Sequence, residues 1–228
     1  MSATFVTATG TDIGKTFVTR GLIRALKARG RDVAAVKPIV TGFEPAEAAG
    51  SDSGLLLAAL GRAVTLEAIA GISPFRFAAP LAPDMAAARE GRALDFSALV
   101  DFCRSTIASN RGELLIEGLG GVMSPVDPAH TMLDWMATLR LPLLLVAGSY
   151  LGTISHTLTA LDVIARRGLE VACVVVSESA GSSVRLDENR DAIARFAPHL
   201  EIVALPRLPG NTFEHPAFGR IAERLGKP

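Results

Sequence analysis

The stretch "ATGTDIGKT", Ala8 to Thr16, decides how the chain around it is organised. It follows the short apolar and β-branched run Thr4–Thr7 and precedes "FVTRGLIRALKARG", in which apolar residues recur at helical spacing. A strand, a glycine-containing loop and the start of a helix, in that order, are typical of a phosphate-binding loop, where backbone N–H groups surround an anion. The stretch therefore predicts nucleotide binding rather than an ordinary strand-to-helix turn.

The glycine spacing of this loop departs from the common pattern. G-x-x-x-x-G-K-[ST] would place glycine where Thr9 stands, although Gly14, Lys15 and Thr16 supply its second half. We expect Gly10 to provide a positive-φ turn from the neighbouring position.

Outward from the loop, strand-length apolar runs alternate with segments of helical spacing. The expected strands are Phe5–Val6, Val33–Val36, Leu114–Ile116, Leu143–Val146, Val171–Val176 and Ile202–Ala204. The expected helices are Thr16–Arg29, Leu55–Leu60, Leu133–Leu139, Ile154–Arg167 and Leu186–Phe196, with Gly30 and Gly168 ending two of them. Runs such as "LPLLLVAG" are typical of parallel strands covered on both faces. We predict an α/β fold of the P-loop NTPase type: one domain over residues 1–228, with a mostly parallel central sheet and helices on both faces. The Pro-rich segment Ser73–Asp84 is expected to be an ordered surface excursion.

Composition narrows the classes of function. The 228 residues are 49% hydrophobic, and 23 Lys and Arg balance 23 Asp and Glu, so no basic surface for nucleic acid is expected. No apolar run approaches the roughly 18 residues of a membrane span, and the start of the chain lacks the order of a secretory signal, so we expect a cytoplasmic protein. Cys103 and Cys173 lie far apart without a Cys/His cluster, which favours buried apolar roles.

A scarce lysine falls at the expected ligand-binding edge of the sheet. The chain has four lysines, and Lys37 ends the second expected strand in "VAAVKPIVTG". Ligands of such sheets bind at the carboxyl ends of the strands, where a cation would face a transferring phosphoryl group. A strand-end lysine that reaches solvent is the alternative. Thr41 lies just beyond and can donate a hydrogen bond to a ligand.

Two acidic residues are candidate magnesium ligands. Glu117 ends the strand in "ELLIEGLGG", and the glycines after it allow a ligand to approach the backbone. Asp52, in "GSDSGLLLAAL", is either a second ligand or the N-cap of the following helix, a role that Ser51 or Ser53 could share.

Taken together, the motifs resemble those of the dethiobiotin synthetase family, the ATP-dependent carboxylases of biotin biosynthesis. The resemblance runs from about residue 4 to residue 211 and rests on "FVTATGTDIGKT", "VKPIVTG", "GSDSGLLL", "SPFRFAAPLAP", "LLIEGLGGVMSPVD", "LPLLLVAGSYLGTISHTL" and "LPRLPGN". The family often has one more residue between its loop glycines than the common pattern. Ala8 stands here at the family's usual first glycine, and Gly10 is additional.

The resemblance implies a reaction. The family converts 7,8-diaminopelargonic acid, CO2 and ATP into dethiobiotin, ADP and phosphate. One amine captures CO2 as a carbamate, the carbamate oxygen attacks the γ-phosphate, and the second amine closes the resulting carbamic-phosphoric anhydride to a cyclic urea. Every stage is anionic, which is why two lysines and Mg²⁺ converge on it.

The resemblance also implies roles for matching positions. Lys15 is implied to hold the β- and γ-phosphates, and Lys37 to stabilise the carbamate and its phosphorylated form. The implied Mg²⁺ ligands are Thr16, Asp52 and Glu117. The implied substrate contacts are Thr11 and Thr41. The implied nucleotide-binding positions are Asp12, Ile13, Gly14, Lys15, Thr16, Phe17, Asp52, Glu117, Gly118, Leu119, Gly120, Ser177, Pro206, Arg207 and Leu208. Ser177 stands where relatives often carry an asparagine that contacts the purine.

Family members are homodimers, so a second copy of the chain is the implied protein partner. The segment Leu151–His156 of the second subunit is implied to hold the carboxylate tail of the substrate, through Leu151, Gly152 and Thr153 at a helix N-terminus. His156 is then structural, and Tyr150 replaces the basic residue of some relatives.

Three alternatives use the same loop. Related amidotransferase-type synthetases need a nucleophilic cysteine, and neither cysteine here has such surroundings. Partition-type ATPases, which act through nucleotide-switched dimers and a protein partner, carry an extra lysine where Gly10 stands. An inactive relative retained for binding would not need the intact set Lys15, Thr16, Lys37, Asp52 and Glu117.

Overall fold

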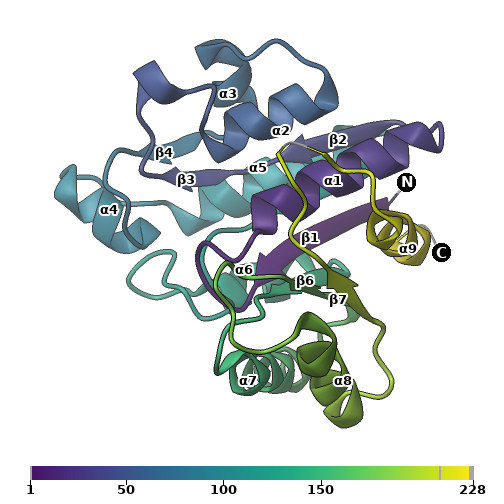
Figure 1. Ribbon diagram of the computed structural model, residues 1–228. Helices are drawn as coiled ribbons and strands as arrows, with labels where there is room; N and C mark the ends of the chain where they lie inside the picture. The colour runs from purple at the N-terminus through teal and green to yellow at the C-terminus, as the bar shows by residue number, and fades with distance from the viewer. Residues whose placement is uncertain (1, 211, 226–228) are drawn as a thin grey trace.

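The computed structural model describes residues 2–210 and 212–225, and its centre is a parallel sheet in the strand order β2-β5-β1-β6-β7-β8 (Figure 1). These strands are β1 (Ser2–Ala8), β2 (Val33–Val36), β5 (Glu113–Glu117), β6 (Leu143–Ala147), β7 (Val171–Ser177) and β8 (Ile202–Leu205). A separate parallel pair is formed by β3 (Ile39–Thr41) and β4 (Phe75–Phe77). All strand pairs in both sheets are parallel.

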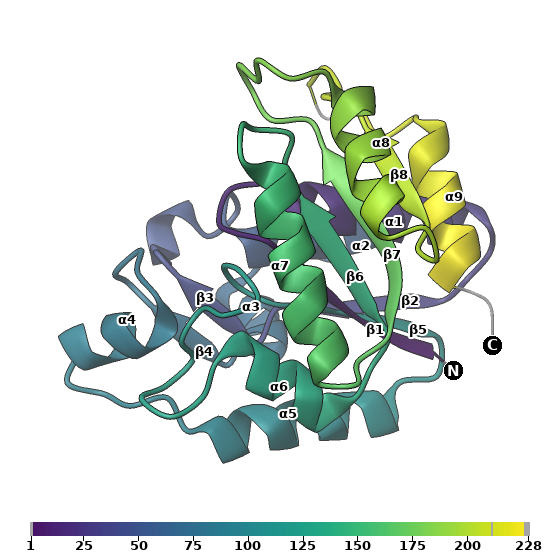
Figure 2. The ribbon, with the colours of Figure 1, turned by 90° about the horizontal axis from the view of Figure 1, so that it is seen from below.

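Helices cover both faces of the central sheet (Figures 1 and 2). One face carries α1 (Lys15–Ala28), α2 (Asp52–Leu60) and α9 (Pro216–Leu225). The other carries α5 (Phe96–Ser109), α6 (Met132–Leu139), α7 (Thr153–Arg166) and α8 (Leu186–Phe196). The shorter elements η1 (Pro45–Glu47), α3 (Leu66–Ile72) and α4 (Pro83–Arg89) accompany the β3–β4 pair. Among the described helices, none has the length and apolarity needed to cross a membrane.

The predicted α/β organisation is confirmed, and the six expected strands all form. The pair β3–β4 and the helices α3, α4, α5 and α9 were not predicted. The segment Ser73–Asp84, expected to be an ordered surface excursion, contains β4 and starts α4, and its Phe77 is buried. The two expected helix-ending glycines lie one residue beyond the caps Arg29 and Arg167, and both have positive φ.

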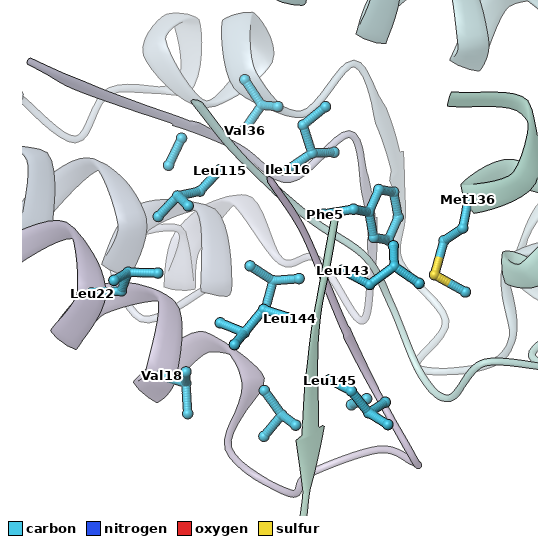
Figure 3. Packing of buried hydrophobic residues seen from close by; sticks show 14 of the residues in the cluster. Phe5, Val18, Leu22, Val36, Leu115, Ile116, Met136, Leu143, Leu144 and Leu145 are labelled. Carbon is cyan, nitrogen blue, oxygen red and sulfur yellow. The ribbon is translucent and has the colours of Figure 1, made fainter. Parts of the chain in front are cut away.

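The hydrophobic core lies between β1, β5, β6 and the helices above and below them. Figure 3 shows Val18 and Leu22 of α1 on one side of the strands and Met136 of α6 on the other. The ring of Phe5 in β1 meets Trp135 of α6 edge to face, with 4.9 Å between ring centroids. Burying each such large side chain contributes about 1.5–3 kcal/mol, so the central strands are fixed from both faces.

The parallel arrangement gathers the functional loops at one edge of the sheet. The carboxyl ends of β1, β2 and β5 are Ala8, Val36 and Glu117, and the loop before α1, Lys37 and the "GLGG" turn follow them directly. Register fixes this edge, because Val6 of β1 pairs with Glu117 and Val36 of β2 pairs with Ile116. Residues that are distant in the sequence therefore meet where a ligand of an open parallel sheet binds.

The crossing of α1 and α9 requires glycine at position 21. A Cβ built on Gly21 would lie 2.0 Å from Cε1 of Phe218, which is fully buried beside Phe17 and Phe213 and has no room to withdraw. Gly71, which is exposed in α3, has no atom within 4 Å of the same position.

We predict that Gly21→Ala lowers the free energy of unfolding by about 1–3 kcal/mol, because overpacking forces α1 and α9 apart. Gly71→Ala is the matched control, and it should leave stability unchanged or raise it by up to about 1 kcal/mol through helix propensity. Urea unfolding followed by circular dichroism measures both. Equal stability of the two variants would contradict the packing assigned to Gly21.

Candidate active site

The loop between β1 and α1 closes around its own lysine. Lys15 Nζ donates hydrogen bonds to the carbonyl oxygens of Gly10, at 3.2 Å, and of Gly120, at 2.8 Å. The left-handed residues of the loop are Asp12, with φ 57°, and Gly14, with φ 99°. The expectation that Gly10 supplies a positive-φ turn is therefore wrong. The chain reverses at Asp12 instead, since aspartate is among the few side chains that tolerate this conformation.

No carboxylate of residues 2–210 and 212–225 forms an ion pair with the Lys15 ammonium. Its hydrogen bonds go to backbone carbonyls, and its side chain is buried. Burial, reinforced by the Lys37 ammonium, lowers the pKa of Lys15 to about 8. An anion placed in the loop would stabilise the charged form of Lys15 further, so the position is suited to binding phosphate oxygens.

Lys37 is bound between two carboxylates. Its Nζ lies 2.7 Å from Oδ2 of Asp52 and 2.7 Å from Oε1 of Glu117. Only 2% of Lys37 is exposed, which rules out a strand-end lysine reaching solvent. Burial by itself would lower the pKa of Lys37, but the two carboxylates outweigh it and raise this pKa above its usual value.

The role left open for Asp52 is resolved by the cap of α2. Ser51 is the N-cap, and its hydroxyl accepts a hydrogen bond from the N–H of Gly54 at 3.2 Å. Asp52 is the first residue of the helix, and its carboxylate pairs with Lys37. Partial burial opposes ionisation of Asp52, but Lys37 lowers its pKa below the usual value. Asp52 is therefore a charged member of the site and not the cap.

The oxygen atoms around Glu117 fit a divalent cation. Glu117 is fully buried, and its Oε1 accepts from the Thr16 hydroxyl at 2.7 Å. Its Oε2 has no hydrogen-bond partner in the part of the chain that the structure describes. An orphaned buried carboxylate oxygen, a second carboxylate at Asp52 and a hydroxyl are the hard oxygen donors that Mg²⁺ prefers. Among residues 2–210 and 212–225 no group of three or more His, Cys, Asp or Glu forms a metal cage. A Mg²⁺ ion here would take its other ligands from phosphate and water.

A cavity of about 570 Å³ opens over these groups. It brings together the predicted residues Thr11, Asp12, Gly14, Lys15, Thr16, Phe17, Lys37, Thr41, Asp52, Leu119 and Gly120. Gly118 does not line it, but its carbonyl oxygen lies 3.4 Å from Lys37 Nζ. Glu117 does not line the cavity either, because it is fully buried behind Thr16 and Lys37. The cavity joins a phosphate-binding loop, two ammonium groups and the carboxylate of Asp52.

The wall opposite the loop was not predicted from the sequence. Pro80, Leu81, Ala82 and Ser124 also line the cavity. Gly42 allows this wall to approach, since its N–H donates to Ala79 O at 3.1 Å and its φ is 69°. The sequence signal that could have found the wall is the pair of "AP" dipeptides near Pro80, which we assigned to the surface.

A second cavity of about 540 Å³ lies on the other side of the phosphate loop. It contains the predicted residues Ile13, Ser177, Pro206, Arg207 and Leu208 and shares Asp12, Gly14 and Phe17 with the first cavity. Tyr150, Glu178, Ser179, Ala180 and Gly210 complete its lining. Asn211, the last residue of "LPRLPGN", lies outside the described residues. The two cavities can thus receive one ligand that extends across the loop.

The predicted carboxylate-binding segment lies apart from both cavities. Leu151, Gly152 and Thr153 line neither of them. Leu151 is 81% exposed at the N-terminus of α7, whereas Thr153 is buried and donates to Gly148 O at 2.8 Å. Nδ1 of His156 lies 2.9 Å from the Tyr150 hydroxyl.

Comparisons with known proteins agree with this arrangement. The family model described as an AAA domain matches residues 2–214. The chain is 49% identical to the ATP-dependent dethiobiotin synthetase BioD of Caulobacter sp. (strain K31), over 99% of this chain and 94% of that protein. It is 46% identical to the protein of the same name from Acidiphilium cryptum (strain JF-5), over 86% of this chain and 88% of that protein.

Solved structures share the fold at low sequence identity. The septum site-determining protein MinD from Pyrococcus horikoshii OT3, complexed with Mg-ADP, matches with a TM-score of 0.56 and 16% identity, over 99% of this chain and 96% of that one. This likeness places the chain in the P-loop fold, and the much higher identity to the synthetases separates it from the partition-type ATPases. The chain belongs to the dethiobiotin synthetase family.

Proposed function

We propose that this protein is an ATP-dependent dethiobiotin synthetase, which carboxylates 7,8-diaminopelargonic acid with CO2 and closes the product to a cyclic urea while ATP becomes ADP and phosphate. The observation that carries the proposal is the pair of buried ammonium groups, Lys15 and Lys37, in one cavity beside a phosphate-binding loop. A phosphorylated carbamate needs positive charge on both its phosphoryl and its carbamate end.

The two lysines divide this task by position. Lys15 projects from the loop and binds the β- and γ-phosphates, which supply the anionic partner that its ammonium lacks. Lys37 approaches from the end of β2 and neutralises the carbamate that forms when one amine attacks CO2. The carbamate oxygen then attacks the γ-phosphorus, and ADP leaves. The second amine attacks the carbonyl carbon of the anhydride, and the cyclic urea and phosphate are released.

The remaining cavity residues orient the two substrates. Thr11 and Thr41 donate hydrogen bonds to the diamine, and the apolar wall at Pro80 and Leu81 excludes water from the anhydride. Asp12, Ile13 and Phe17, with Gly118, Leu119 and Gly120, surround the phosphates and sugar. Ser177, Pro206, Arg207 and Leu208 form the pocket for the nucleotide base.

Thr16, Asp52 and Glu117 hold Mg²⁺ in this proposal, and the ion supplies positive charge to the phosphate oxygens. Lys37 affects Mg²⁺ binding directly in this proposal, because its ammonium already forms ion pairs with Asp52 and Glu117. The ammonium and the divalent ion therefore compete for the same two carboxylates.

We further propose a cytoplasmic homodimer in which the chain acts as one domain over residues 1–228. The exposed N-terminus of α7 supports the dimer, because Leu151, Gly152 and Thr153 are remote from the cavities of their own chain. In a dimer this segment reaches the cavity of the other subunit, where the helix N-terminus binds the carboxylate tail of the diamine. The N–H of Thr153 donates to Tyr150 O at 3.0 Å and fixes the segment.

The first test is phosphate release from Mg-ATP and bicarbonate, with and without diaminopelargonic acid. We predict that release depends on the diamine and that mass spectrometry identifies dethiobiotin as the organic product. Omitting Mg²⁺ should abolish release. Phosphate release that is indifferent to the diamine would point to a switch ATPase and overturn the proposal.

Lys37→Gln tests the division of labour between the lysines. Turnover should fall by about 10³-fold or more, because a preorganised charge in the transition state is lost, while Mg-ADP still binds. Without nucleotide, the variant should bind Mn²⁺ more tightly than the wild type in electron paramagnetic resonance titrations, because the competing ammonium is gone.

Lys27→Gln is the matched control, since Lys27 contacts the end of α2 at Leu60 O and lies outside the cavities. It should change neither turnover nor Mn²⁺ binding. Retained turnover in Lys37→Gln would remove Lys37 from its assigned role.

The shared site of the dimer can be tested by mixing two impaired variants. Lys37→Gln lacks the ammonium, and Leu151→Asp places a negative charge beside the carboxylate tail and should raise KM for the diamine. Unfolding and refolding the two together should restore about a quarter of wild-type activity at low diamine, because mixed dimers contain one intact site. No gain over the separate variants would contradict a site built from two subunits.

A further inference from the structure

Two serines join the loops that follow β6 and β7. The N–H of Ser149 donates to Oγ of Ser179 at 3.0 Å, and the N–H of Ser179 donates to Oγ of Ser149 at 2.9 Å. We call this reciprocal pair the serine clamp. Its two members are 30 residues apart in the sequence, and each satisfies a backbone donor of the other.

The clamp is fixed from further directions. The carbonyl oxygen of Ser149 accepts from Oγ of Ser182 at 2.6 Å and from Nδ2 of Asn189 in α8 at 2.9 Å. Ser149 is fully buried, and Asn189 is 1% exposed. Ser179 and Ser182 are half-buried. The network restrains both loops, because moving one group leaves its buried partners at Ser149 and Asn189 unpaired.

On one side, the clamp holds the pocket assigned above to the nucleotide base. Ser177, Glu178, Ser179 and Ala180 are consecutive lining residues of the second cavity. Tyr150, the neighbour of Ser149, lines the same cavity from the opposite loop. A base that enters this cavity therefore contacts both halves of the clamped unit.

On the other side, the clamp leads into the exposed N-terminus of α7. Thr153 closes the loop after β6 by donating to Gly148 O at 2.8 Å. A Cβ on Gly148 would lie 2.7 Å from the Tyr150 ring and 2.9 Å from Oγ of Ser179, so the turn packs tightly against the clamp. Residues 148–153 consequently move with Ser179 as one body.

We infer that the serine clamp couples occupancy of the base pocket to the position of Leu151–Thr153, and that Ser149 and Ser179 are positioning residues for the acceptor tail. The inference rests on the proposed function, in which Leu151–Thr153 binds the carboxylate of the diamine. A nucleoside triphosphate then raises the affinity for the diamine more than inorganic tripolyphosphate does, because both fill the phosphate loop but only the nucleotide fills the base pocket.

Calorimetry on the full-length protein tests the coupling. The Kd of diaminopelargonic acid is measured in bicarbonate-free buffer with Mg²⁺ and saturating tripolyphosphate, and again with the non-hydrolysable analogue AMP-PCP. We expect the diamine to bind about 5-fold or more tightly with AMP-PCP than with tripolyphosphate, within the usual range of coupling between two sites.

Ser149→Ala removes one hydroxyl of the clamp without touching the cavity lining. It should reduce this ratio to within about twofold of unity while the Kd of AMP-PCP stays within about threefold of wild type. Ser179→Ala is a second variant with the same expected loss, and Ser179→Thr, which keeps the hydroxyl, should retain the ratio.

Thr157→Val controls for a merely structural effect, because it removes a buried hydrogen bond to Thr153 O within α7 and leaves the clamp intact. It should keep the wild-type ratio. If all ligands bind but the diamine has the same Kd with tripolyphosphate as with AMP-PCP, the coupling is overturned and the proposed function is not. A coupled wild type with an unchanged ratio in both alanine variants would overturn the role of the clamp. Failure of the diamine to bind in any state would overturn the proposed function and the inference with it.

Discussion

The ion pairs of Lys37 with Asp52 and Glu117 are the constraint on which the site depends. They tie the end of β2, the first residue of α2 and the end of β5 to one point. An ammonium buried to this degree is retained only where opposite charges and hydrogen bonds replace water. Lys37 and Asp52 also line the main cavity, so a ligand that enters it meets the charges that hold these three elements together.

The two lysines of the cavity show how local surroundings decide what a cation does. Lys37 faces carboxylates, which raise its pKa, whereas Lys15 faces backbone carbonyls, and burial lowers its pKa to about 8. Lys15 is thus the ammonium that gains most from an incoming phosphate. Lys37 is already paired and becomes available to a second anion only when another cation takes its carboxylates. One cavity therefore holds two ammonium groups that differ in the ligand each is suited to bind.

Sequence reasoning located the candidate site residues that lie at strand ends. The loop up to Thr16, Lys37 and Glu117 follow apolar runs directly, and parallel topology is enough to bring them together. The sequence did not reveal features that depend on packing between segments distant in the chain. The apolar wall at Pro80 and the clamp at Ser149 come from loops whose approach is set by neighbours far away in sequence. The left-handed turn at Asp12 was wrongly given to Gly10, because composition reveals which residue tolerates positive φ and not which one needs it. The missed helix α5 did carry a signal, since Asp95 caps its N-terminus through Ser97 and Ala98.

The positions of β1 and α1 affect the order in which parts of the protein can fold. β1 lies in the middle of the sheet, between β5 and β6, and α1 packs against α9 through Gly21 and Phe218. The elements β1 and α1 are therefore completed by partners that follow them at long distance in the sequence. Such non-local pairing forms slowly, and apolar surface of β1 and α1 stays exposed until the distant partners have packed. The frame of the phosphate loop is complete only when α9 has packed against α1, so we expect ligand binding to follow this late packing step.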